Sequence, residues 1–219
     1  MLCIVFLLGV ASPYPVMAPI DRYRIASRSD EISLARSAAP ASISAGAEVL
    51  VLGSRGYEIA AKGANGFVCF VERSWTAGFD APEFWNPKIL GPNCFNAAAA
   101  RTELPQILKR TQWVMAGVSR EQMMAKTRAA FAAGEFAAPA PGALSYMLSK
   151  RGYLSDDGAG PWLPHLMFFV TSAQARLWGS GLKGSPLIGE VGDDTLGSTV
   201  VMIPVRRWSD GTPAPPPSS

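Results

Sequence analysis

Residues 65–75, NGFVCFVERSW, decide the fold of this chain. The pair Asn65-Gly66 is a turn signal, and the apolar, β-branched and aromatic run that follows is typical of a strand. Phe67, Cys69 and Val71 would face one side of that strand, and the apolar residues between them would face the other. We therefore predict a strand that is covered on both faces and lies near the middle of a sheet.

The segments on either side of this stretch predict a strand-rich domain with a helical middle. Apolar segments at 48–52 and 57–62 are joined to it by short glycine-containing turns, which predicts a three-stranded antiparallel meander. Asn96 and the capping box of Ser119 and Gln122 are expected to begin helices. Three further apolar segments read as strands: 143–149, 164–170 and 198–205.

This order of elements predicts an α+β fold, with a single mainly antiparallel sheet and helices packed on it. It is similar to the order of elements in PAS and profilin-like domains, a likeness of fold that carries no function. We expect one domain over 47–207, preceded by an N-terminal helix and linker at 19–46, with Ser29 or Asp30 as its cap, and followed by a disordered, proline-rich tail at 208–219.

The first 18 residues read as a signal or leader segment. Residues 1–10, MLCIVFLLGV, are apolar and uncharged but shorter than the roughly 20 residues that a membrane-spanning helix needs. The alternative is a buried N-terminal strand. The signal interpretation implies a periplasmic or secreted protein without an integral membrane span. Nucleic acid is not an expected partner, because the net charge is only +3 and no block of Lys or Arg occurs.

The number of cysteines also indicates an exported protein. Removal of the leader would leave only Cys69 and Cys94, and an even pair in an exported protein predicts a disulfide. Such a bond would close a loop of about 25 residues and contribute roughly 3.5 kcal/mol in the chain-entropy model. The alternative is two buried free thiols.

Residues 75–96 form a predicted long loop rich in aromatic side chains, including Trp75 and Trp85. A loop of this length inside a compact domain is usually functional or packed on itself. We expect it either to form a ligand-binding wall or to close one end of the core as a lid.

Few residues suggest catalytic chemistry. The chain lacks the common catalytic motifs, and its single histidine excludes a zinc centre with several histidines, so no metal and no cofactor is predicted. His165 begins an apolar strand, and Asp156 or Asp157 in the preceding loop, or Glu72, could serve it as a carboxylate partner. The alternative is a structural histidine bonded to a backbone carbonyl.

Glu72 and Arg73 end the strand at 67–72, and as neighbours they must face opposite sides of the sheet. A charge on a covered face must be paired. Arg73 is therefore expected either to pair with a carboxylate or to bind an anionic ligand near the aromatic loop. Tyr146, on the predicted strand at 143–149, is a candidate for the same ligand site.

Three segments carry a resemblance: 31–40 (EISLARSAAP), 65–69 with 71–73 (NGFVC and VER) and 164–168 (PHLMF). They resemble an uncharacterised family of exported bacterial proteins, to which no activity is attached. We expect an exported protein that binds a small molecule or another exported protein. The alternative is a hydrolase that uses His165 with a nearby carboxylate.

Overall fold

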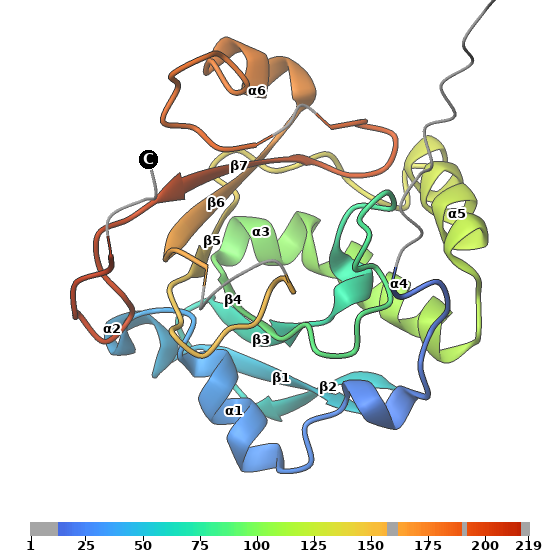
Figure 1. Ribbon diagram of the computed structural model, residues 1–219, viewed down its shortest axis with the longest axis horizontal. Coiled ribbons are helices and arrows are strands. Elements are labelled where there is room, and N and C mark those ends of the chain that lie inside the picture. The colour runs from blue at the N-terminus through green and yellow to red at the C-terminus, as the bar shows by residue number, and fades with distance from the viewer. Residues whose placement is uncertain (1–12, 157–161, 190–191, 216–219) are drawn as a thin grey trace, which may run out of the picture.

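The computed structural model describes residues 13–156, 162–189 and 192–215 (Figure 1). Its strands are β1 Glu48–Gly53, β2 Gly56–Ala61, β3 Val68–Glu72, β4 Gly91–Phe95, β5 Leu144–Met147, β6 His165–Val170 and β7 Thr199–Pro204. Its helices are α1 Arg28–Arg36, α2 Ala41–Ser44, α3 Ala97–Thr102, α4 Leu104–Met115, α5 Arg120–Ala132 and α6 Ser172–Leu177, with 3₁₀ turns η1 Ile20–Tyr23 and η2 Ser74–Thr76. The strands form one sheet in the order β2-β1-β3-β4-β5-β6-β7, which confirms the α+β prediction.

The sheet is mixed, because β1 and β3 run parallel while the other neighbouring pairs are antiparallel. The predicted antiparallel meander is therefore correct for the β1–β2 hairpin and wrong for β3, which pairs with β1 instead of β2. The connection from β2 crosses the start of β1 closely enough that a Cβ on Gly63 would lie 2.1 Å from the amide nitrogen of Glu48. Only a residue without a side chain permits this crossing.

Strand β3 is covered on both faces, as its two-sided apolar pattern predicts. Cys69 and Val71 pack with α1, whereas Phe70 packs on the opposite face in the cluster that includes Phe95 and Leu104. The neighbouring strand β4 was expected to be part of a long loop. Its sequence, GPNCF, has little strand propensity, but all five of its residues are buried between β3 and β5.

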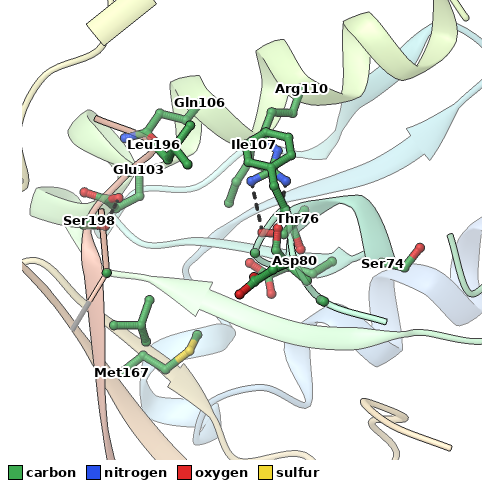
Figure 2. A pocket seen from close by; sticks show the side chains of 18 of the residues that line it. Ser74, Thr76, Asp80, Glu103, Gln106, Ile107, Arg110, Met167, Leu196 and Ser198 are labelled. Atoms are coloured by element: carbon green, nitrogen blue, oxygen red, sulfur yellow. Dashed lines mark hydrogen bonds between the residues drawn. The ribbon is translucent and has the colours of Figure 1, made fainter. Parts of the chain in front are cut away.

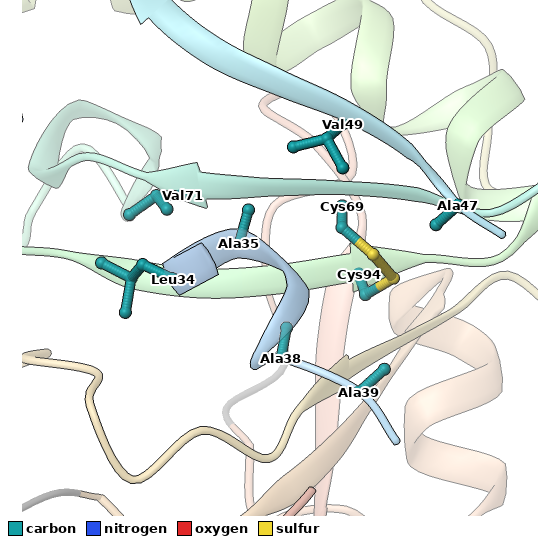
Figure 3. Close-up of a cluster of buried hydrophobic side chains, with 9 residues drawn as sticks. All are labelled: Leu34, Ala35, Ala38, Ala39, Ala47, Val49, Cys69, Val71 and Cys94. Carbon is teal, nitrogen blue, oxygen red and sulfur yellow. A yellow bond between two sulfur atoms is a disulfide. The ribbon is translucent and has the colours of Figure 1, made fainter. Parts of the chain in front are cut away.

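The face under α1 is closed and tightly packed (Figure 3). Alanines of α1 and of the segment after it let the helix lie close to the sheet. Cys69 and Cys94 are directly opposite each other on β3 and β4, with their Cα atoms 4.0 Å apart, and they form the predicted disulfide. The N-cap of α1 is Ser27, whose side chain accepts from the Asp30 amide, rather than Ser29 or Asp30.

The other predicted caps are as expected. The Asn96 side chain accepts from the Ala99 amide and begins α3, and Ser119 and Gln122 form the capping box of α5. These bonds satisfy amide groups that a helix leaves without a partner in its first turn.

Both ends of the described chain pack on the domain. Tyr14 donates to Asp156, and Met17 and Ala18 pack against the cluster that contains Trp75 and Trp85, so part of the predicted leader contacts the fold. Residues 208–215 differ from the expected disordered tail. Trp208 is buried, and the chain turns back on itself there through backbone bonds. No helix in the described part of the chain is long and apolar enough to cross a membrane.

Candidate functional site

A cleft of about 920 Å³ opens on the face of the sheet opposite α1 (Figure 2). Its floor comes from β3, β6 and β7, one wall is α4, and the other walls are the chain segments 74–83 and 192–198. The apolar part of its lining includes Ile107, Leu154, Met167, Phe169, Val200 and Met202. Its polar part includes Glu72, Ser74, Asp80, Glu103, Gln106, Arg110 and Ser198.

Glu72 is the last residue of β3, and its side chain lines the cleft. Burial raises its pKa to about 7, and the Asn93 amide and the charge of Arg110 oppose that rise. Among the described residues, however, the Asn93 side chain makes no hydrogen bond of normal geometry, although it is fully buried. Glu72 is partly exposed to the cleft, and its raised pKa means that it changes charge near neutral pH.

Glu103 lies at the N-terminus of α4 and is only 5% exposed. Its carboxylate accepts from Thr102 Oγ1 at 2.9 Å and from Ser198 Oγ at 2.6 Å. Burial raises its pKa, and the two hydroxyl groups offset part of that rise. No Lys, Arg or His forms an ion pair with Glu103 among the described residues, so its negative charge is hydrogen-bonded but not neutralised.

Arg110 lies two turns further along α4 and is also buried. It donates to the backbone carbonyl groups of Thr76 and Ala77, at 3.4 and 2.7 Å, and its guanidinium carbon lies 4.2 Å from the ring centre of Phe79. Burial lowers its pKa to about 10, and the charge of Glu72 opposes that shift. Arg110 therefore holds the segment after η2 in place, while its Nε has no partner among the described residues.

Acidic side chains outnumber basic ones along the cleft. Five carboxylates contribute to its lining, namely Glu72, Asp80, Glu83, Glu103 and Asp193. Three arginines contribute, namely Arg73, Arg110 and Arg120, but the guanidinium group of Arg73 is bonded elsewhere. Asp193 is likewise paired elsewhere, with Arg128 at 3.3 Å, so four carboxylates face two available cations, which favours a positively charged ligand group over a negative one.

Arg73 is a structural residue on the closed face. It has no exposed surface, and its guanidinium donates to Glu31 at 2.8 Å and to the carbonyl groups of Tyr23 and Val71. Glu31 also accepts from the Leu52 amide. This is the pairing alternative for Arg73. An anion at Arg73 has no support here, because each guanidinium nitrogen already donates to an acceptor in the protein and the side chain has no exposed surface.

Tyr146 lies apart from Glu72. It is directly opposite Cys94 in the pairing of β5 with β4, which puts its side chain on the face of the sheet under α1. Its ring lies 6.2 Å from that of Phe67. Tyr146 thus belongs with the closed face, and the cleft is on the other side.

Trp75 and Trp85 are buried and line no part of the cleft. The indole of Trp75 donates to Thr111 Oγ1 at 3.0 Å, and the Tyr23 hydroxyl donates to the Trp85 carbonyl group at 2.8 Å. This part of the aromatic loop therefore packs against η1 and α4 as a lid over the core. Phe79, in contrast, lines the cleft beside Arg110.

His165 is 3% exposed, and its Nδ1 lies 2.7 Å from the carbonyl oxygen of Leu163. Burial lowers its pKa. This is the structural alternative for His165, which lines a small apolar pocket of about 230 Å³ with Trp162. The expected partner Asp156 is instead surrounded by other donors: Tyr14, Asn86, Lys88 and Tyr153. Asp157, the other expected partner, lies outside the described residues.

Glu103 and Arg110 are site residues that the sequence did not reveal. A signal for them exists, because the polar residues at 103, 106 and 110 recur at helical spacing beside the apolar face of α4. Polar residues buried at such positions are informative, since most buried helix positions are apolar.

Neither a metal site nor a similarity to known proteins assigns a function to the cleft. No group of three or more His, Cys, Asp or Glu side chains among the described residues is arranged to hold a metal ion. A scan against protein-family models and searches of curated proteins and solved structures found no match.

Proposed function

We propose that this protein binds a small molecule in the cleft between α4 and the sheet, and that it does so outside the cytoplasm. One observation carries the proposal. Glu103 is a buried carboxyl group and Glu72 is a partly buried one, the pKa of each is raised, and both line a cleft large enough for a ligand. Buried ionisable groups are usually paired, and groups left without an ionic partner beside an open volume are typical of binding sites.

The lining of the cleft supports ligand binding over a purely structural role. Its floor is apolar, its rim carries a few polar groups, and its volume lies within the range usual for small-molecule sites. On the closed face, in contrast, the described residues of α1 pack directly against the sheet.

Export is supported by the Cys69–Cys94 disulfide, because such bonds persist in oxidising compartments. The periplasmic or secreted location, the leader and the family resemblance stay predictions. Export is tested by fractionating cells of the native host, and recovery of the protein with the cytoplasmic markers would contradict it.

Native mass spectrometry of protein purified from its own host tests the binding proposal. We expect a bound mass that is released on denaturation and is absent from Met167→Trp, which fills the cleft floor. The matched control is Leu177→Trp, because Leu177 is 86% exposed on α6 and away from the cleft. A bound mass that survives Met167→Trp, or no bound mass in any preparation, would contradict the proposal.

A second candidate function is general acid–base catalysis by Glu72. The observation that favours it is a carboxyl group with a pKa of about 7 in a cleft, since such a group exchanges protons readily at neutral pH. In a hydrolase screen, we expect Glu72→Gln to abolish any activity that the parent shows and His165→Ala to retain it. The reverse result would restore the histidine-based alternative.

A further inference from the structure

We propose that the ligand of this cleft is an organic cation, with protonated amine groups on an apolar chain, and that Glu103 and Glu72 bind those amines. This inference rests on the proposed function and names the class of molecule that the site would take. It follows from the charges, the unpartnered hydroxyl group and the apolar floor of the cleft.

The first step is the contrast between two buried carboxyl groups, Glu31 and Glu103. Glu31 is buried and is neutralised by Arg73 at 2.8 Å. Glu103 is equally enclosed, but its partners are the two hydroxyl groups and no cation. A buried carboxylate is stable only when its charge is compensated, so a ligand cation at Glu103 would supply what Arg73 supplies to Glu31.

Arg110 does not neutralise this part of the cleft. It follows Glu103 by seven residues on α4, which corresponds to roughly 10 Å along the helix axis. Its terminal nitrogens are held by the carbonyl groups of Thr76 and Ala77. Glu72 feels the Arg110 charge and therefore belongs to that end of the cleft. The two carboxyl groups thus lie toward opposite ends of the α4 wall.

An unpartnered hydroxyl group provides a second, independent observation. Ser74 lines the cleft and is 1% exposed, but its hydroxyl has no hydrogen-bond partner among the described residues. A hydroxyl oxygen accepts hydrogen bonds, and an ammonium group offers three donors. Buried polar groups in native proteins normally have partners, so the Ser74 hydroxyl indicates a missing one.

The floor between the two ends suits a methylene chain. Met167, Phe169 and Met202 project from β6 and β7 into the cleft. Methionine side chains adapt to flexible apolar ligands. A linear diamine would therefore place its chain on this floor and one amine at each carboxyl group.

Isothermal titration calorimetry at pH 8 with 1,6-diaminohexane tests the inference, with 1,6-hexanediol as the uncharged analogue of equal length. We expect the diamine to bind at least about tenfold more tightly than the diol. Glu103→Gln should weaken diamine binding by about 10- to 100-fold, the usual effect of losing a charge-assisted hydrogen bond. Glu72→Gln should weaken it as well. Glu135→Gln, an exposed site away from the cleft, should leave binding unchanged.

The outcomes separate this inference from the proposed function. Equal binding of diol and diamine, or diamine binding that survives both Glu103→Gln and Glu72→Gln, would overturn the amine assignment. The absence of diamine binding to the parent protein would overturn it as well. In each of these cases, the proposed function would still stand if native mass spectrometry found a bound mass that is lost in Met167→Trp. Circular dichroism spectra and melting temperatures of the variants exclude loss of folding as the cause.

Discussion

The two faces of the sheet deal with buried charge in opposite ways. On the face under α1, Glu31 and Arg73 neutralise each other beneath a layer of alanines and a disulfide. On the opposite face, Glu103 is buried and Glu72 is partly buried beside a cleft, and neither forms an ion pair with any of the described residues. The difference begins at two adjacent residues, since Glu72 and Arg73 leave β3 in opposite directions. One sheet therefore combines a closely packed face with a face that carries an open cleft.

Removal of the Arg73 charge should have the largest effect. Arg73→Leu leaves Glu31 as an unpaired buried carboxylate, and we expect the free energy of unfolding to fall by about 3–5 kcal/mol. Urea denaturation followed by circular dichroism measures this. The double variant Glu31→Leu/Arg73→Leu should recover part of the loss, because two apolar residues no longer leave a charge unpaired. A double variant less stable than Arg73→Leu would contradict the ion-pair explanation.

Loss of the disulfide should come next. In Cys69→Ala/Cys94→Ala, the unfolded chain regains the freedom of a loop closed over a sequence separation of 25 residues, which corresponds to about 3.5 kcal/mol. The same urea titration measures the change. Added reductant should destabilise the parent protein and leave the double variant unchanged. A parent protein that is insensitive to reductant under denaturing conditions would show that the thiols are free.

The pH dependence of stability should show the contribution of Glu72 on the cleft face. Burial raises the Glu72 pKa from 4.5 to about 7, so the folded state holds this proton more tightly than the unfolded state. The resulting stabilisation is fully present below pH 4.5 and is lost as the pH rises through 7. Between pH 4.5 and 8, the free energy of unfolding of the parent should fall by at most about 3 kcal/mol more than that of Glu72→Gln.

Urea titrations of both proteins at several pH values measure this difference. The lowered pKa of His165 acts with the opposite sign, but His165 is present in both proteins and its contribution cancels. Parallel pH profiles for the parent and Glu72→Gln would rule out a raised Glu72 pKa.

The smallest expected effect compares two valines. Val71 is fully buried on the closed face, whereas Val200 lines the cleft. Val71→Ala should cost about 2–3 kcal/mol, because it leaves a void that the packed core cannot fill. Val200→Ala should lower the free energy of unfolding by about 1 kcal/mol or less, because it only enlarges the existing cleft. Equal losses in thermal unfolding experiments would mean that the cleft floor is as tightly packed as the core.

The sequence predicted those features that depend on local pattern. The apolar residues on both sides of β3 predicted a strand covered on both faces. Asn96, Ser119 and Gln122 predicted the starts of helices, because their side chains bond nearby backbone amide groups. The disulfide followed from the number of cysteines. Each of these inferences needs only residues that are close together in the chain or a simple count.

Features that depend on distant contacts were not predictable in this way. The partner of Arg73 is Glu31, 42 residues earlier, and no local pattern joins them. The parallel pairing of β3 with β1 depends on the close crossing at Gly63, and β4 is a strand because its neighbours bury it. Glu103 enters the site through the packing of α4 on the sheet. Tertiary context therefore decided both the register and the chemistry of the cleft.

The most direct test of the contrast is the same isosteric change on each face, measured by urea unfolding at pH 8. Glu31→Gln removes a neutralised charge and leaves Arg73 unpaired, so we predict a loss of about 3 kcal/mol or more. Glu72→Gln removes a charge that burial disfavours, so we predict a gain in stability. Changes of opposite sign would support a closed face and a ligand-binding face. A loss of similar size in both variants would contradict that contrast.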